Sequence, residues 1–298
     1  MDHDAQFRRG LLLGLAAYVI WGFLPLYFHA LRDVPPVELV GWRIVATLPL
    51  CLVIIARRGQ SPDLRAALAN RAVLAQLACS ALLIGGNWLI YVTAIMHGHV
   101  LAASLGYFIN PLVNVLLGTV FLGEKLSRRQ WLAVAIATAG IALLLGDALD
   151  MLAISLSLAV TFALYGLVRK VTPVGSVPGL TIETMVLVLP AIGVVAWFAY
   201  APAGSSMARD PFTAAMLLGT GVLTAIPLLM FAVAARRLNL SLLGFIQFIS
   251  PTIVFLMGVT VFHEALDPLR TGCFVLIWIA IALFSWDMLA RRSRNAAT

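Results

Sequence analysis

The sequence is poor in charge and in cysteine. Only 11% of its 298 residues are Asp, Glu, Lys or Arg, whereas 62% are hydrophobic. A soluble domain carries about 25% charged residues because its surface faces water, so this composition excludes an ordinary soluble protein. The three cysteines, Cys51, Cys79 and Cys273, all lie in apolar runs and show no metal-ligand spacing. We therefore expect no disulfide framework, no metal and no cofactor.

Several catalytic motifs are also missing. The chain contains no GxxxxGK[ST] loop for ATP, and neither HExxH nor GxSxG occurs. We therefore expect that the protein is not an enzyme, with an intramembrane enzyme as the less favoured reading. The net charge of +7 does not indicate a nucleic-acid partner, because the basic residues flank apolar runs.

Ten apolar runs are long enough to cross a bilayer as helices, which requires about 20 residues each. The fold class is therefore an all-α polytopic membrane protein. The expected spans are Gly10–Ala30, Pro36–Ala56, Val73–Met96, Leu101–Leu122, Gln130–Gly146, Leu149–Val168, Val177–Tyr200, Phe212–Ala235, Leu240–Phe262 and Leu269–Leu289.

The basic residues predict which way the protein sits in the membrane. In this layout sixteen of the twenty Lys and Arg residues lie on one side and three on the other, while Arg43 lies inside a span. Cytoplasmic loops are enriched in Lys and Arg. We therefore expect a multi-pass protein with both termini in the cytoplasm.

The two halves of the sequence resemble each other. Shifted by 140 residues, Phe108–Leu126 matches Phe248–Leu266 at seven of 19 positions, including Pro111/Pro251 and Glu124/Glu264. The repeats would cover residues 10–146 and 149–290, with five spans each. Because five is odd, the second repeat starts on the opposite face and is inverted. Inverted repeats around a site near the midplane are typical of secondary transporters.

The segment GYFINPLVNVLLGTVFLGEKLSRRQWLAVAIATAGI (Gly106–Ile141) resembles the EamA-type exporters of the drug/metabolite transporter superfamily. The segments ALYGLVRK (Ala163–Lys170) and AIPLLMFAVAARRLNLSLLGFIQFISPT (Ala225–Thr252) resemble one bacterial group of that family. The resemblance implies a bacterial inner-membrane protein with two five-helix repeats around a central cavity. It also implies a small-molecule substrate, such as a metabolite or a chloramphenicol-type drug. The oligomeric state is not indicated.

Polar residues in apolar spans are candidates for lining that cavity, because an unpaired amide in hydrocarbon costs several kcal/mol. The alternative is hydrogen bonding between helices, worth about 0.6 kcal/mol per contact. In the second repeat, Gln247 and Ser250 match the positions of Tyr107 and Asn110. The candidates are Asn87, Tyr91, Ser104, Tyr107, Asn110, Asn114, Gln247 and Ser250.

Aromatic and proline residues give further candidates. Trp21, Trp88 and Tyr165 could form walls for a flat substrate, with ordinary packing as the alternative. Pro111 and Pro251 interrupt matching spans and could act as hinges or gates, with a simple packing kink as the alternative.

Charged residues inside spans are few. Arg43 would either contact substrate or a gate, or extend its side chain to the headgroups. Glu183 would either titrate or form a structural anchor with the neighbouring Arg169-Lys170 pair, and the anchor is favoured.

These features together predict a secondary transporter that exports small molecules by alternating access, driven by a proton gradient or by the substrate gradient alone. The alternative is a membrane scaffold or sensor that carries no flux.

The topology can be tested with single cysteines placed at residues 5 and 295 of a cysteine-free variant. Because both tails are expected in the cytoplasm, a membrane-impermeant maleimide should label neither in intact cells and both after permeabilisation. Labelling of only one tail in intact cells would rule out the inverted repeat.

Overall fold

The computed structural model describes residues 3–96, 100–145, 152–202, 204–261 and 268–296. Regular structure in these residues is helical throughout, and all ten expected spans coincide with helices. By length and hydropathy, eight helical stretches of the described chain could cross a membrane, and Gly106–Phe121 forms a shorter apolar helix. The all-α polytopic fold is confirmed.

The first half contributes α1 (His3–His29), α2 (Pro36–Arg57), α3 (Ser61–Ala69), α4 (Arg71–Met96), α5 (Val100–Phe121) and α6 (Arg128–Leu145). The second half contributes α7 (Leu152–Val171), α8 (Ser176–Tyr200), α9 (Pro211–Arg237), α10 (Leu240–Gln247), α11 (Ile249–Thr260) and α12 (Pro268–Ala296). A short 3-10 turn, η2 (Ser206–Ala208), precedes α9.

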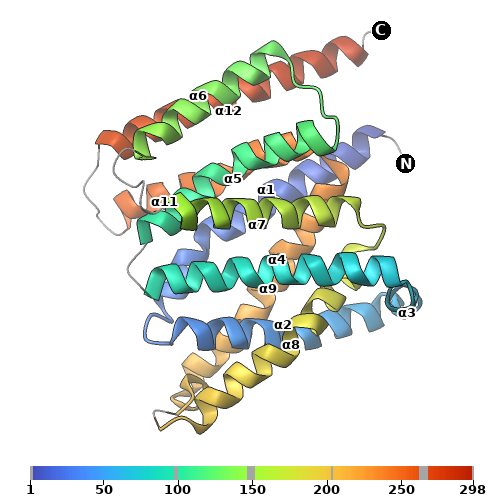
Figure 1. The fold of residues 1–298 in the computed structure, drawn as a ribbon, viewed down its shortest axis with the longest axis vertical. Helices are drawn as coiled ribbons and strands as arrows, with labels where there is room; N and C mark the ends of the chain where they lie inside the picture. The colour runs from blue at the N-terminus through green and yellow to red at the C-terminus, as the bar shows by residue number, and fades with distance from the viewer. Residues whose placement is uncertain (1–2, 97–99, 146–151, 203, 262–267, 297–298) are drawn as a thin grey trace.

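The main helix pairs all join one half to the other. Helix α6 packs on α12, α5 on α7 and α10, α2 on α8 and α9, α1 on α9 and α11, and α4 on α7 and α8. If α1, α2, α4, α5 and α6 are exchanged with α7, α8, α9, α10/α11 and α12, this set of pairs maps onto itself. Two repeats related by a two-fold axis would give this pattern, in which the helices of the two halves interleave in one bundle (Figure 1).

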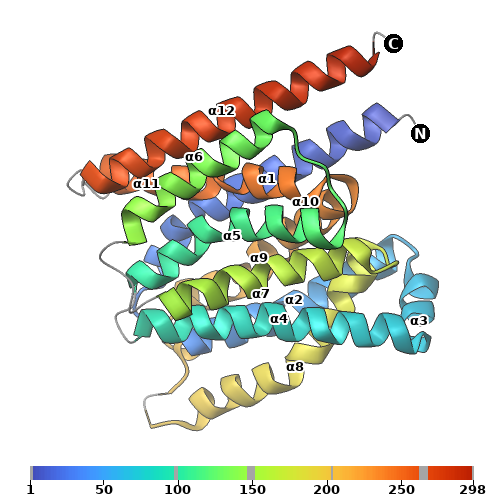
Figure 2. The ribbon, with the colours of Figure 1, turned by 45° about the horizontal axis from the view of Figure 1, so that its top comes forward.

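The start of α1 and the end of α12 lie at the same end of the bundle in both views (Figures 1 and 2). The connections from α2 to α4 and from α7 to α8 lie at that end too. These connections carry many of the basic residues counted in the sequence.

Helix α3 lies between the second and third expected spans. Its Leu64 and Ala67 are buried with Val73, Leu77 and Val177, so α3 covers that end of the bundle. A serine followed by proline and an acidic residue (Ser61–Asp63) is a typical helix start, and this signal could have revealed the helix.

The two matched prolines behave differently. The ninth span is broken between Gln247 and Ile249, four and two residues before Pro251. A proline can cause such a break, because its ring clashes with the carbonyl four residues earlier. By contrast, α5 continues through Pro111. There the carbonyl oxygen of Pro111 faces Gly244, where an added Cβ would lie 2.8 Å from it.

Two carboxylates tie helix ends together. Glu124 accepts hydrogen bonds from the backbone N–H of Leu240 (2.5 Å) and of Ser241 (2.9 Å), at the start of α10. Its counterpart in the second half, Glu264, lies outside the described residues. Near the opposite end, Glu38 accepts from the Ser206 N–H (2.9 Å).

Glycine permits the close crossing of α9 over α2. A Cβ at Gly221 would lie 2.7 Å from the backbone oxygen of Ala46, whereas one at Gly193 of α8 would meet nothing within 4 Å. We expect Gly221→Ala to destabilise the protein by about 1–3 kcal/mol, because overpacking forces backbone shifts. Thermal unfolding of detergent-purified protein would measure this. Gly193→Ala is the control, and equal melting temperatures for the two variants would contradict the close crossing.

Candidate functional site

A small cavity lies between α2, α4, α8 and α9. Helices α2 and α4 belong to the first half of the chain, and α8 and α9 belong to the second half. In the contact pattern described above, α2 corresponds to α8 and α4 corresponds to α9, so each half lines the cavity with the same two helices. Most of its lining is apolar, with a single carboxylate. The lining residues are Ile44, Thr47, Ile84, Trp88, Leu180, Glu183, Thr184, Leu187, Thr224 and Leu228.

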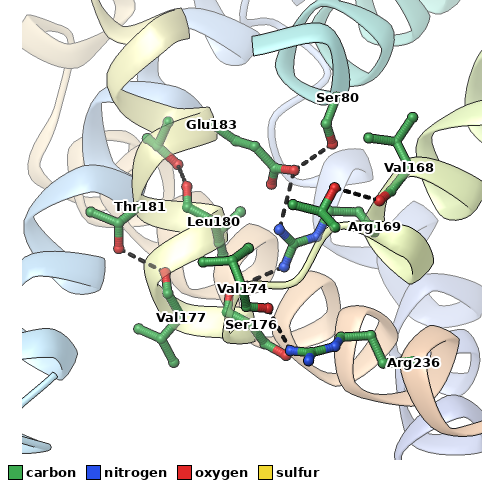
Figure 3. Close-up of polar contacts among 12 residues, drawn as sticks. Ser80, Val168, Arg169, Val174, Ser176, Val177, Leu180, Thr181, Glu183 and Arg236 are labelled. Atoms are coloured by element: carbon green, nitrogen blue, oxygen red, sulfur yellow. Dashed lines mark hydrogen bonds and ion pairs between the residues drawn. The ribbon is translucent and has the colours of Figure 1, made fainter. Parts of the chain in front are cut away.

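A buried ion pair bounds one side of this cavity (Figure 3). The Oε1 atom of Glu183 lies 3.5 Å from Nη1 of Arg169 and accepts a 2.5 Å hydrogen bond from the Ser80 hydroxyl. Arg169 is 1% exposed and also donates to the Ser176 carbonyl at 3.2 Å. The contacts join α4, α7 and α8.

The carboxylate of Glu183 is only partly satisfied. Its second oxygen, Oε2, is buried and makes no hydrogen bond. The anchor expected between Glu183 and the basic pair is confirmed for Arg169. Lys170 instead donates to the carbonyls of Ala235 (3.0 Å) and Leu238, so it fastens α7 to the end of α9.

Arg43 extends into the bundle. Its Nε atom donates a 3.0 Å hydrogen bond to the Thr224 hydroxyl on α9. Its guanidinium carbon lies 4.8 Å from the ring centre of Trp88 on α4 and 5.6 Å from that of Phe28 on α1. Since Trp88 and Thr224 also line the cavity, Arg43 adjoins the cavity.

Two tyrosines stand near Arg43. The rings of Tyr91 and Tyr107 meet edge to face with their centres 5.9 Å apart, and both residues lie close to Arg43. Tyr107 is 41% exposed, although its neighbours Phe108 and Asn110 on α5 are buried. The structure therefore brings together Arg43, Tyr91 and Tyr107 among the residues predicted from the sequence.

The predicted amides lie elsewhere and bond between helices. Asn87 donates to the Leu158 carbonyl (2.8 Å) and to the Thr161 hydroxyl (2.9 Å) on α7. Asn110 on α5 donates to the Ala159 carbonyl of α7 (2.6 Å). Asn114, one turn later on α5, donates to the side-chain oxygen of Asn110 (3.1 Å) and to that of Gln247 on α10 (3.3 Å). In this conformation these groups hold α4, α5, α7 and α10 together.

The other candidates are spread through the structure. Tyr165 stacks on Phe231 with ring centres 5.8 Å apart, and Trp21 lies 5.7 Å from the same ring. Ser250 is half-buried at the start of α11. The side chain of Ser104 lies outside the described residues.

Several residues at the site were not singled out from the sequence: Phe28, Thr47, Ser80, Thr184 and Thr224. Serine and threonine in a helix can bond their own backbone, as Thr224 does to the Thr220 carbonyl at 2.7 Å. Their presence in an apolar span therefore carries no signal that another helix needs them.

Comparison with known proteins gives consistent matches. The sequence model described as the EamA-like transporter family matches residues 8–146. Protein RarD of Escherichia coli K12 is 42% identical over 98% of both chains. An uncharacterized transporter of Pseudomonas aeruginosa is 42% identical over 95% of both chains. A protein of the same organism named chloramphenicol-sensitive protein RarD is 30% identical over 97% of both chains.

One solved crystal structure shares the fold. It is 19% identical, with a TM-score of 0.75 over 96% of this chain and 99% of the other. At this identity the likeness concerns the arrangement of helices alone.

Loss of one partner of the buried ion pair should be costly. We expect Glu183→Gln to lower stability by about 3–5 kcal/mol, because it leaves the Arg169 guanidinium buried without a counter-charge. The double variant Glu183→Gln/Arg169→Gln should recover part of this loss. Unfolding of the single and double variants in detergent micelles would measure the coupling, and simple additivity would show that the pair contributes nothing.

Proposed function

The chain belongs to the EamA family of the drug/metabolite transporter superfamily, and we propose that it is a secondary transporter that exports small molecules by alternating access. The 42% identity to RarD over nearly the whole length carries the family membership. The chain is a multi-pass membrane transporter. The substrate class, the direction and the mechanism are our proposal.

The observation that best supports the proposal is the composition of the central cavity. Two helices from each repeat line it, and they are equivalent pairs. In inverted-repeat transporters the substrate site lies at such a repeat interface, and the repeats exchange conformations to expose it to either side. A protein that merely bound a partner would not need this symmetry.

The ion pair supplies the closing contact in this scheme. Arg169 and Glu183 join the end of α7 to α8 (Figure 3), and α7 connects to α8 at the end of the bundle that holds both termini (Figure 1). Opening the cavity toward that end requires α7 and α8 to separate and the pair to break. Its partly unsatisfied carboxylate makes the closed arrangement less stable than a fully bonded one would be.

The orientation follows from charge. Basic residues concentrate at the end that holds both termini, which supports a cytoplasmic position for that end in a bacterial inner membrane.

The substrates are small metabolites or drugs. The name of the Pseudomonas aeruginosa relative supports chloramphenicol-type compounds as the first to test. A proton gradient or the substrate gradient supplies the energy.

The proposal is tested by blocking the cavity. Leu187 lines the cavity, whereas Leu189 on the same helix is 76% exposed on the outer surface. In a drug-sensitive bacterial host, the wild-type protein should lower the accumulation of chloramphenicol or of another compound in a metabolite panel. Leu187→Trp should abolish most of this effect because the indole fills the path, and Leu189→Trp should preserve it.

Membrane levels of each variant, measured by immunoblot, are the control. Two results would refute the proposal: no compound responding to the wild-type protein at normal membrane levels, or full activity in Leu187→Trp. Repeating the assay with an uncoupler distinguishes a proton gradient from the substrate gradient.

A further inference from the structure

Arg43 is a cation inside an apolar span that has no carboxylate partner in the described part of the chain. It is the eighth residue of α2, roughly 10 Å from the helix start at 1.5 Å per residue. The ion pairs of the described residues join Arg129 to Asp287 and Arg169 to Glu183. An unpaired charge at such a depth is expensive and is usually functional.

The guanidinium of Arg43 keeps free donors. Its Nε bonds to Thr224, and the rings of Trp88 and Phe28 lie beside it. The two terminal nitrogens carry four further N–H groups. They donate to no described residue, and the Arg43 side chain is half-buried, not fully enclosed. The terminal nitrogens are therefore accessible to a molecule that enters between the helices.

The surroundings favour an anion over a cation or a neutral group. The terminal N–H groups of an arginine match the two oxygens of a carboxylate. Tyr91 and Tyr107 lie near Arg43, and each carries a hydroxyl that can donate a hydrogen bond. One arginine neutralises one negative charge, so a singly charged carboxylate fits better than a doubly charged phosphate, whose second charge would remain uncompensated.

The apolar lining of the adjoining cavity matches the rest of such a molecule, but the cavity now has room for about one water, so the helices must move apart to admit it. Trp88 contacts both the guanidinium and the cavity, and the lining beyond it includes Ile84, Leu187 and Leu228. A molecule with its carboxylate on Arg43 would thus place an apolar or aromatic body along Trp88.

We propose that Arg43, with Tyr91 and Tyr107, binds the carboxylate of a small organic monoanion whose apolar body occupies the cavity between α2, α4, α8 and α9. This proposal rests on the transport function above and names its substrate class. The protein would therefore favour small aromatic or aliphatic acids over neutral compounds of the same shape.

Three probes of one shape test the charge requirement: 3-phenylpropionate, 3-phenylpropanol and 3-phenylpropylamine. A ligand that binds the folded state raises its melting temperature. For purified wild-type protein in phosphatidylcholine nanodiscs, we expect the acid to bind at least about tenfold more tightly than the alcohol or the amine, because charge-assisted hydrogen bonds contribute factors of that order. Equal shifts with all three probes would overturn the proposal.

Substitutions identify the site. Arg43→Gln should reduce the affinity for 3-phenylpropionate at least about tenfold, and Tyr107→Phe should reduce it less. The control Arg32→Gln removes an exposed arginine of the adjacent connection and should leave the affinity unchanged. Without ligand, Arg43→Gln should melt no lower than the wild type, because no described carboxylate loses its partner. Unchanged affinity in both Arg43→Gln and Tyr107→Phe would overturn the assignment.

Two further measurements separate the possible sources of failure. Adding phosphatidylglycerol to the nanodiscs tests whether an anionic lipid headgroup occupies the site. If phosphatidylglycerol lowers the affinity for 3-phenylpropionate, the lipid competes for Arg43, and this result would count against a soluble substrate. Counterflow of radiolabelled 3-phenylpropionate in liposomes then tests transport. Binding without flux would refute the proposed function, whereas export of neutral drugs without binding of the acid would refute only this inference.

Discussion

Every polar group that this protein buries between its helices needs a partner, because hydrocarbon offers none. An unsatisfied polar group in an apolar environment costs several kcal/mol. The buried polar side chains therefore form hydrogen bonds to neighbouring helices. Asn87 and Asn110 bind carbonyls of α7, Asn114 binds Gln247, and Glu124 binds the first amides of α10. These bonds join the two repeats, so polar satisfaction and assembly of the bundle are the same process.

The candidate site lies where this rule is only partly met. Glu183 keeps one oxygen without a partner, and Arg43 keeps its terminal nitrogens free of described partners. Glu183 lies on α8 and Arg43 lies on α2, the helix that corresponds to α8 in the first half, and both residues adjoin the cavity. Incomplete pairing is costly in a static structure but useful in a transporter, because a ligand or a conformational change can supply what is missing.

Interleaving of the repeats has a mechanical consequence. Because α2 packs on α8 and α9 while α4 packs on α7 and α8, neither half of the described chain has a core of its own that could move as an isolated body. In the transport cycle proposed above, helices would slide past one another at close crossings such as Gly221 on Ala46 and Gly244 on Pro111. Small residues at these crossings let backbones approach, which is the usual basis of helix packing in membranes. Alternating access would then proceed by exchanging one set of equivalent contacts for the other.

Local features of the sequence were enough to predict the spans and the class of protein. The length of an apolar run determines whether a helix can cross the bilayer, and the charges flanking it bias its direction, so neither needs a partner helix. Helix α3 was not among the expected spans, because it is short and amphipathic. The matched prolines did not indicate that the ninth span would break while α5 continued through Pro111.

Which polar residues pair and which remain available was decided only by the tertiary structure. Asn110 and Arg43 look alike in the sequence, as single polar groups in apolar spans. One meets the Ala159 carbonyl of α7, and the other meets Thr224, Trp88 and the cavity. Their difference depends on contacts between residues far apart in the chain, and no local pattern encodes such distances.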